Sequence, residues 1–218
     1  MNTFIKLLFL LTVYHSFGQN DGMMPNNNIR DLYFHGNPSL ISKLKKQAGS
    51  NEYLFLFAEK SNDSIFTLYV LNNSKTTIDI PVVADKIYII QEAIDSEGKW
   101  KPIEYFNYHF CGNAYRIEKF KSGNVIKTKS TAYKGNFNTK IRFKLLVKDK
   151  IYYSNSLSGN IPLSQFMFSE TAKQKSGFIT SSYQTNEKLT MKLLFLEPNC
   201  MSEFNTELHR KVNLKKKK

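Results

Sequence analysis

Hydrophobic and polar residues alternate with a period of two along much of this chain. The alternation is clearest at residues 65–70, 140–147 and 188–195. Because successive side chains of a β-strand point to opposite faces, each run predicts a strand with one buried and one largely solvated face. Runs rich in β-branched and aromatic residues predict further strands at residues 86–94, 115–120, 125–128, 151–154 and 178–183.

Turn residues separate these strands at short intervals. Asp95–Gly98, Lys121–Asn124 and Lys148–Lys150 carry residues typical of hairpin connections. Short antiparallel strands at this spacing indicate a sandwich or a barrel, and we predict an all-β fold, an antiparallel immunoglobulin-like β-sandwich. No internal repeat or composition break divides the chain, so a single β-rich domain is expected over residues 37–214.

One segment near the N-terminal end predicts a helix over residues 38–48. Asn37 and Pro38 suit its cap and first turn, and Gly49 suits its end. The residues expected on its apolar face are Leu40, Ile41 and Leu44.

The first residues have the pattern of a secretory signal peptide. Lys6 precedes the apolar run Leu7–Val13, and the small residues Ser16 and Gly18 precede a cleavage point before Gln19. A membrane anchor needs about 20 apolar residues, so this run is too short to be one, and no other segment approaches a transmembrane span. The alternative is that the run forms a buried N-terminal strand.

The signal-peptide interpretation divides this end of the chain in two. Residues 1–18 would be removed, and the polar, turn-rich residues 19–36 would form a flexible leader. The mature protein would then be exported, to the periplasm or out of the cell. Export permits a disulfide bond between Cys111 and Cys200, and the alternative is two buried thiols.

The composition is that of a folded protein with an uneven charge. Of the 218 residues, 41% are hydrophobic and 14% aromatic, which excludes a wholly disordered chain. The formal net charge is +13, but Arg210–Lys218 contains six basic and no acidic residues. We expect a short helix over residues 202–214 and a frayed basic tail over residues 215–218. The cap and the inward residues of that helix would be Ser202, Phe204 and Leu208.

Aromatic residues gather between residues 100 and 115. Rings exposed at a surface bring a large contact area at a low entropy cost, and they stack on sugars or grip peptides. The alternative is that these rings pack inside the sandwich. The candidate ligand-binding residues are Trp100, Tyr105, Tyr108 and Tyr115, and Phe106 and Phe110 lie between them.

Basic residues form a second candidate surface. Lys140, Arg142 and Lys144 alternate with apolar residues on one predicted strand, and Lys188 and Lys192 do so on a later strand. One sheet holding both strands would have a positive outer face that attracts anionic glycans or an anionic envelope surface. The alternative is a set of solvated lysines that keeps the sheet soluble. The expected export argues against nucleic acid as a partner.

Motifs for catalysis are mostly missing from the sequence. It contains no phosphate-binding loop, no His-Glu-x-x-His, no Cys-x-x-Cys and no Gly-x-Ser-x-Gly. Glu92 and Glu104 flank a predicted hairpin and are a candidate carboxylate pair for glycoside hydrolysis. His109 and Cys111 are spaced for a metal ligand pair or a Cys–His nucleophile, but further ligands or an orienting group are not evident. We therefore predict no cofactor and no metal.

A resemblance adds to this interpretation. The stretch from Gln91 to Tyr105 (QEAIDSEGKWKPIEY), with CGNAY at 111–115, YKGNFNTKIRF at 133–143 and YSN at 153–155, resembles exported proteins of Bacteroidetes whose function is uncharacterised. The resemblance spans roughly residues 62–168 and implies export and a β-rich domain. The function predicted is an exported, non-enzymatic binding or structural module for a glycan or peptide. The alternative is an exported hydrolase with an unrecognised carboxylate or histidine site.

Overall fold

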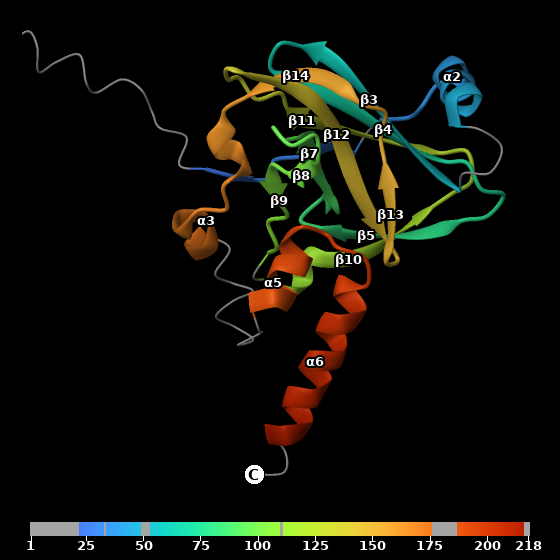
Figure 1. The fold of residues 1–218 in the computed structure, drawn as a ribbon. Coiled ribbons are helices and arrows are strands. Elements are labelled where there is room, and N and C mark those ends of the chain that lie inside the picture. The colour runs from blue at the N-terminus through green and yellow to red at the C-terminus, as the bar shows by residue number, and fades with distance from the viewer. Residues whose placement is uncertain (1–21, 33, 49–52, 110, 176–186, 216–218) are drawn as a thin grey trace, which may run out of the picture.

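The computed structural model (Figure 1) describes residues 22–32, 34–48, 53–109, 111–175 and 187–215. The predicted signal peptide and the predicted strand at residues 178–183 lie outside the described residues. The strands are β1 (Met24–Pro25), β2 (Ile29–Asp31), β3 (Leu54–Asn62), β4 (Ile65–Asn72), β5 (Ile78–Val83), β6 (Lys86–Ile87), β7 (Ile89–Ile94), β8 (Trp100–Pro102), β9 (Glu104–Tyr105), β10 (Tyr115–Phe120), β11 (Val125–Thr131), β12 (Phe137–Val147), β13 (Lys150–Tyr153) and β14 (Leu157–Ile161). The helices are α2 (Pro38–Ala48), α3 (Glu170–Lys175), α5 (Glu187–Leu194) and α6 (Cys200–Lys215), with 3₁₀ turns at Gly112–Ala114 and Leu163–Phe166.

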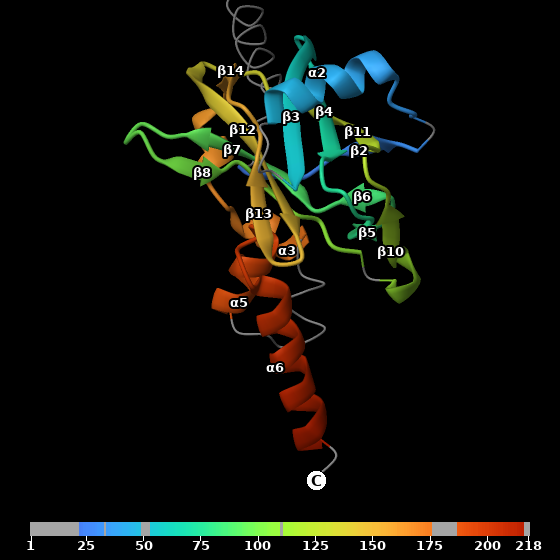
Figure 2. The same ribbon diagram turned by 90° about the vertical axis from the view of Figure 1, so that its right-hand side faces the viewer.

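Two antiparallel sheets enclose the main hydrophobic core (Figure 2). The first sheet has the order β2-β11-β4-β3, and the second has the order β13-β12-β7-β8 with β14 paired to the first half of β12. Phe66 of β4 and Phe143 of β12 join the two sheets, because their rings meet edge to face at 5.6 Å. The predicted all-β class and the strands predicted at residues 65–70 and 140–147 are confirmed.

Smaller sheets and tight turns complete the β-structure. Strands β10, β5 and β6 form a three-stranded sheet, and β1 pairs in parallel with β9. Lys148 and Asp149 form the two-residue turn between β12 and β13, with φ angles of 48° and 61°. Gly98 and Gly123 adopt φ angles of 78° and 74° at two further turns. The predicted turns Asp95–Gly98 and Lys148–Lys150 therefore each connect two antiparallel strands, and Lys121–Asn124 leads from β10 into β11.

Helix α2 spans the predicted residues and covers the outer face of the first sheet (Figure 2). The amide of Leu40 donates a 2.8 Å hydrogen bond to Oδ1 of Asn37, which confirms the predicted cap. Leu44 is fully buried against Leu71 and Val125. The helix therefore forms where a capping residue and an apolar stripe coincide.

The strand predicted at residues 188–195 is wrong, because α5 occupies this segment. Leu189 and Leu193 lie one helical turn apart and are both buried. Their spacing of four suits either period, but Leu, Lys, Met and Glu favour a helix over a strand. The protein consequently has more helix than predicted.

Helix α6 begins two residues before the predicted start and projects away from the sheets (Figures 1 and 2). Its first turns contact α5 and the smaller core around it, where Phe204 is partly buried as predicted. The helix continues to Lys215, the first residue of the predicted frayed tail. The part of the chain after Lys215 lies outside the described residues.

The flexible leader predicted at residues 19–36 is wrong for residues 22–32. Strands β1 and β2 form in this segment, and Asn26 and Asn28 are each only 1% exposed. Nδ2 of Asn28 donates a 2.8 Å hydrogen bond to the carbonyl of Ile89, and Oδ1 of Asn26 accepts one of 2.8 Å from the amide of Asn107. Polar residues typical of a loop are therefore buried here because each bonds to backbone groups.

Candidate functional site

The outer face of the second sheet carries a row of polar and aromatic side chains, which we call the β12 strip. The alternation predicted for β12 holds, since Ile141, Phe143 and Leu145 lie in the core between the sheets. Lys140, Arg142 and Lys144 lie on the opposite face with the residues paired to them. The members of the β12 strip are Asn138, Lys140, Arg142, Lys144, Glu92, Trp100, Tyr153, Ser158 and Asn160.

Arg142 lies at the centre of the β12 strip, between two aromatic rings. Its guanidinium carbon is 4.3 Å from the ring centroid of Trp100 and 3.7 Å from that of Tyr153. Its Nε and Nη2 donate to Oε2 of Glu92 at 2.8 and 2.7 Å. A guanidinium stacked on rings and paired to a carboxylate is held rigidly. Two of the predicted binding residues, Trp100 and Arg142, are thus brought together.

Tyr153 is a member of this stack that our sequence analysis did not select. The two-residue turn at Lys148 and Asp149 pairs Lys144 with Tyr153, so both side chains lie on the outer face. Tyr153 is 45% exposed. The two-residue turn at Lys148 and Asp149 can be recognised in the sequence, and it sets the register of the two strands. Counting residues outward from the turn pairs Tyr153 with Lys144, so this count identifies Tyr153 from the sequence.

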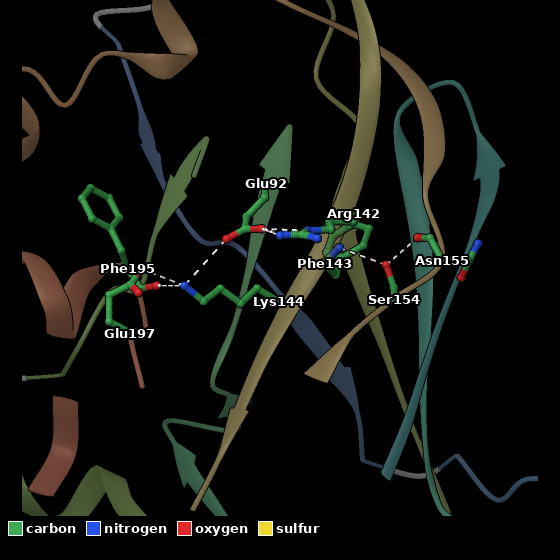
Figure 3. A network of polar contacts seen from close by, with 8 residues as sticks. All are labelled: Glu92, Arg142, Phe143, Lys144, Ser154, Asn155, Phe195 and Glu197. Atoms are coloured by element: carbon green, nitrogen blue, oxygen red, sulfur yellow. Dashed lines mark hydrogen bonds and ion pairs between the residues drawn. The ribbon is translucent and has the colours of Figure 1, made fainter. Parts of the chain in front are cut away.

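Lys144 is buried, which corrects the prediction that it projects into solvent. It is 3% exposed, because the segment after α5 covers it (Figure 3). Its Nζ lies 2.9 Å from Oε1 of Glu197 and 3.7 Å from Oε1 of Glu92, and it donates to the carbonyl of Phe195 at 3.0 Å. The negative charges of Glu92 and Glu197 therefore balance the positive charges of Arg142 and Lys144. This part of the outer face carries no net positive charge.

The other half of the predicted basic face is also wrong. Lys188 and Lys192 lie on helix α5 and not on a strand of the same sheet. Nζ of Lys192 contacts Glu203 of α6 at 2.7 Å. These two lysines therefore do not extend the β12 strip.

The far end of the β12 strip remains polar and open. Nζ of the exposed Lys140 donates to Oγ of Ser158 at 3.0 Å, and Nδ2 of Asn138 donates to Oδ1 of Asn160 at 2.9 Å. A pocket of about 410 Å³ adjoins this end. The residues that line it are Lys60, Asp63, Phe66, Ala132, Tyr133, Lys134, Gly135, Asn138, Ser158, Gly159 and Asn160.

The aromatic cluster predicted as one surface is divided by the fold. Tyr105 is 1% exposed and packs edge to face on Phe168, so its selection as a surface residue is wrong. Phe106 is fully buried and stacks on Tyr88 at 4.6 Å. The physical reason is that this segment runs beneath α5, where the amide of Phe106 donates to the carbonyl of Leu194.

The remaining aromatic candidates do not join the β12 strip. Tyr108 is half-buried, and its hydroxyl donates to the carbonyl of Leu193 at 3.2 Å. Burial raises its pKa. Tyr115 is 36% exposed and its hydroxyl donates to the carbonyl of His109 at 2.7 Å. Phe110 lies outside the described residues.

Glu92 and Glu104 do not form the carboxylate pair that we considered. Glu92 contacts Arg142 on the outer face, whereas Glu104 bonds to the side chain and amide of the adjacent residue, Gln91, at 2.8 and 3.0 Å. Because neighbouring residues of a strand face opposite sides, the two carboxylates lie on opposite faces of β7. Glu104 is fully buried, and desolvation raises its pKa to about 7.

The two cysteines are free thiols, so the predicted disulfide bond is wrong. Cys111 is exposed and follows a loop, while Cys200 is buried at the start of α6. Burial raises the pKa of the Cys200 thiol to about 12. Nδ1 of His109 accepts a hydrogen bond from the amide of Cys111 at 3.2 Å. In the part of the chain that the structure describes, no three His, Cys, Asp or Glu side chains cluster as metal ligands.

None of the described helices is both long and apolar enough to span a membrane. Searches against protein-family models, curated proteins and solved structures found no match to the chain. The arrangement of the β12 strip offers stacking surfaces, hydrogen-bond donors and charges on a rigid sheet. Such groups suit ligand recognition.

Proposed function

We propose that this protein is an exported, non-enzymatic module that binds an acidic glycan along the β12 strip. The observation that supports it most is the stack of Trp100, Arg142 and Tyr153 on the outer face of a rigid sheet. The expected export rests on the signal-peptide pattern of residues 1–18. An immunoglobulin-like sandwich and kinship with exported Bacteroidetes proteins are parts of the same proposal.

The chemistry of the strip suits a sugar polymer. Aromatic rings offer their faces to the apolar side of a sugar, and the amide, hydroxyl and ammonium groups of Asn138, Ser158 and Lys140 hydrogen-bond to its hydroxyls. Residues two apart on β12 are separated by about 6.6 Å and point the same way, so the strip repeats its contacts along the strand. A repeating surface of this kind suits a ligand built from repeating units.

The charges at the open end favour an acidic ligand. Three lysines, Lys60, Lys134 and Lys140, lie in or beside the 410 Å³ pocket, and Asp63 is the acidic residue that lines it. Nζ of Lys60 contacts Asp63 at 3.0 Å and holds the pKa of that carboxyl below its usual value. The remaining positive charge attracts carboxylate or sulfate groups.

A binding assay on the purified protein tests this proposal. We expect polygalacturonate to bind and a neutral glucan to bind at least tenfold more weakly by isothermal titration calorimetry. Trp100→Ala and Lys140→Ala should each weaken the polygalacturonate affinity by about tenfold or more, a loss of about 1.4 kcal/mol. Tyr53→Ala and Lys121→Ala, at an exposed tyrosine and an exposed lysine outside the strip, are the matched controls. Equal affinity in all four variants, or binding of peptides instead, would refute the proposal.

The hydrolase alternative has weaker support. A carboxyl with a pKa near 7 suits a general acid, and Glu104 has this property. However, Glu104 is fully buried, and Tyr133 rather than Glu104 lines the pocket. We therefore assign Glu104 a structural role.

A further inference from the structure

Strand β10 forms one edge of a three-stranded sheet, because among the described residues only β5 pairs with it (Figure 2). The free side of an edge strand presents backbone N–H and C=O groups to which another strand can hydrogen-bond. Four of the six residues of β10 are exposed, and Ile117 near its middle is 68% exposed. The edge is therefore accessible to a further strand.

The backbone groups of Ile117 point toward this edge and not toward β5. In an antiparallel pair of strands, residues that exchange two hydrogen bonds alternate with residues that exchange none. The amide of Ala84 donates to the carbonyl of Ala114 at 2.9 Å, which places the even-numbered residues of β10 in the bonded class. Pro81, the residue opposite Ile117, has no N–H and agrees with this alternation. The N–H and C=O of Ile117 are consequently directed at the edge.

The sequence of β10 is complementary to itself about Ile117. When two antiparallel copies place Ile117 opposite Ile117, each Arg116 lies opposite Glu118 of the other copy. These flanking residues form non-hydrogen-bonded pairs, whose Cα atoms are only about 4.5 Å apart, so their opposite charges attract. A register centred on Glu118 or on Lys119 would instead place like charges opposite each other.

The charges on this face of β10 are already balanced within one chain. Arg116 lies 2.9 Å from Glu118 and also contacts Asp85, and Glu118 also contacts Arg30. Two basic and two acidic side chains therefore sum to zero. A second copy extends this row of alternating charges and brings no excess of one sign to the edge.

We propose that two copies of this protein associate through β10, as an antiparallel pair of strands with Ile117 on the two-fold axis. Ile117 of each copy donates its N–H to the carbonyl of Ile117 of the other copy, and the two exposed side chains shield each other from water. A symmetric contact of this kind uses the same surface patch twice. It includes no residue of the β12 strip, so it does not depend on the glycan proposed there.

Sedimentation velocity of the purified protein tests the association. One strand per copy is a small interface, so we expect a weak monomer–dimer equilibrium with a Kd of about 100 µM, in about 0.15 M salt. Ile117→Lys places two ammonium groups on the two-fold axis and should raise the Kd at least tenfold. Ile29→Lys makes the same change at an isoleucine of β2 that is 72% exposed, and this matched control should dimerise as the wild type does.

Charge exchange tests the register. Arg116→Glu places a glutamate opposite Glu118 of the other copy, and Glu118→Arg places an arginine opposite Arg116, so neither variant should self-associate. Mixed in equal amounts, the two variants regain two pairs of opposite charge and should form a heterodimer with about the wild-type Kd. The proposal is overturned if the wild type stays monomeric at about 1 mM, if Ile117→Lys dimerises as the wild type does, or if the mixture forms no heterodimer.

Discussion

The hydroxyl group of Tyr133 donates a 2.8 Å hydrogen bond to Oε1 of Glu104, a carboxylate that is fully buried. Gln91 donates two further bonds to the same carboxylate, from its amide and its side chain. These contacts join the loop after β11 to β7 and β9. Glu104 therefore connects three segments of the core, and its charge state affects all of them.

We predict that stability falls as the pH rises from about 5 to 8. Desolvation raises the pKa of Glu104 to about 7, above the value of about 4.3 in an unfolded chain. The folded state therefore holds a proton that the unfolded state releases in this window, and its stabilising effect is lost as the pH passes 7. The change is at most about 3 kcal/mol in the free energy of unfolding, measured by urea denaturation.

Two variants check that Glu104 causes this change. Glu104→Gln cannot ionise and should remove the pH dependence in this window. Tyr133→Phe removes a hydrogen bond that favours the ionised form, so the fall in stability should move to higher pH. If Glu104→Gln keeps the wild-type slope, another group is responsible.

A second prediction concerns the buried ion pairs of Figure 3. Glu92 is 5% exposed and lies between Arg142 and Lys144, so Glu92→Gln leaves buried positive charge with one carboxylate fewer. We expect a loss of about 3 kcal/mol in the free energy of unfolding. Glu97→Gln is the matched control, because its pair with Lys99 is exposed and should matter little. Equal effects would contradict the burial of this network.

A third prediction separates core from surface among the aromatic residues. Tyr105→Ala should destabilise the protein by about 3–5 kcal/mol, since it removes a fully buried ring. Trp100→Ala should destabilise it much less, because Trp100 lies partly exposed on the outer face. Thermal and urea unfolding of both variants gives the comparison. A larger loss for Trp100→Ala would show that its ring serves the fold rather than a ligand.

The thiols give a fourth prediction. Cys111 is exposed and should react with a disulfide reagent in the native protein, whereas Cys200 should react only after unfolding. Burial raises the pKa of Cys200 to about 12, which further suppresses its thiolate. At neutral pH, the absorbance of the group released from the reagent should therefore report one fast-reacting thiol in the native protein. It should report two thiols after urea is added. No thiol in urea without reductant would indicate the disulfide bond.

Much of the β-structure was predictable, because strand formation follows local alternation. Residues 140–147 show their inner and outer faces by sequence alone, and Asn37 marks the start of α2. The segment at 188–195 was not predictable in the same way, since Leu189 and Leu193 fit both periods. Its Leu, Lys, Met and Glu content favours the helix, and Leu189 and Leu193 then pack into the smaller core around α5.

The candidate site was predictable only in part. Trp100 and Arg142 were selected from the sequence, but their contact depends on the pairing of β7 with β8 and with β12. In the sequence, Tyr105 belongs to the same aromatic cluster as Trp100, and Lys144 belongs to the same alternating basic run as Lys140. Residue type and spacing therefore do not show that Tyr105 and Lys144 are buried. They are buried because α5 and the segment after it cover one end of the outer face.

By itself, the sequence determined the β-class, the faces of β12 and the cap of α2, because these depend on residues close together in the chain. The tertiary structure decided which end of the outer face stays exposed, which carboxylates meet which cations, and that Cys111 and Cys200 remain free thiols. Those outcomes depend on contacts between segments far apart in the chain, such as Lys144 with Glu197. Local periodicity carries no information about such contacts.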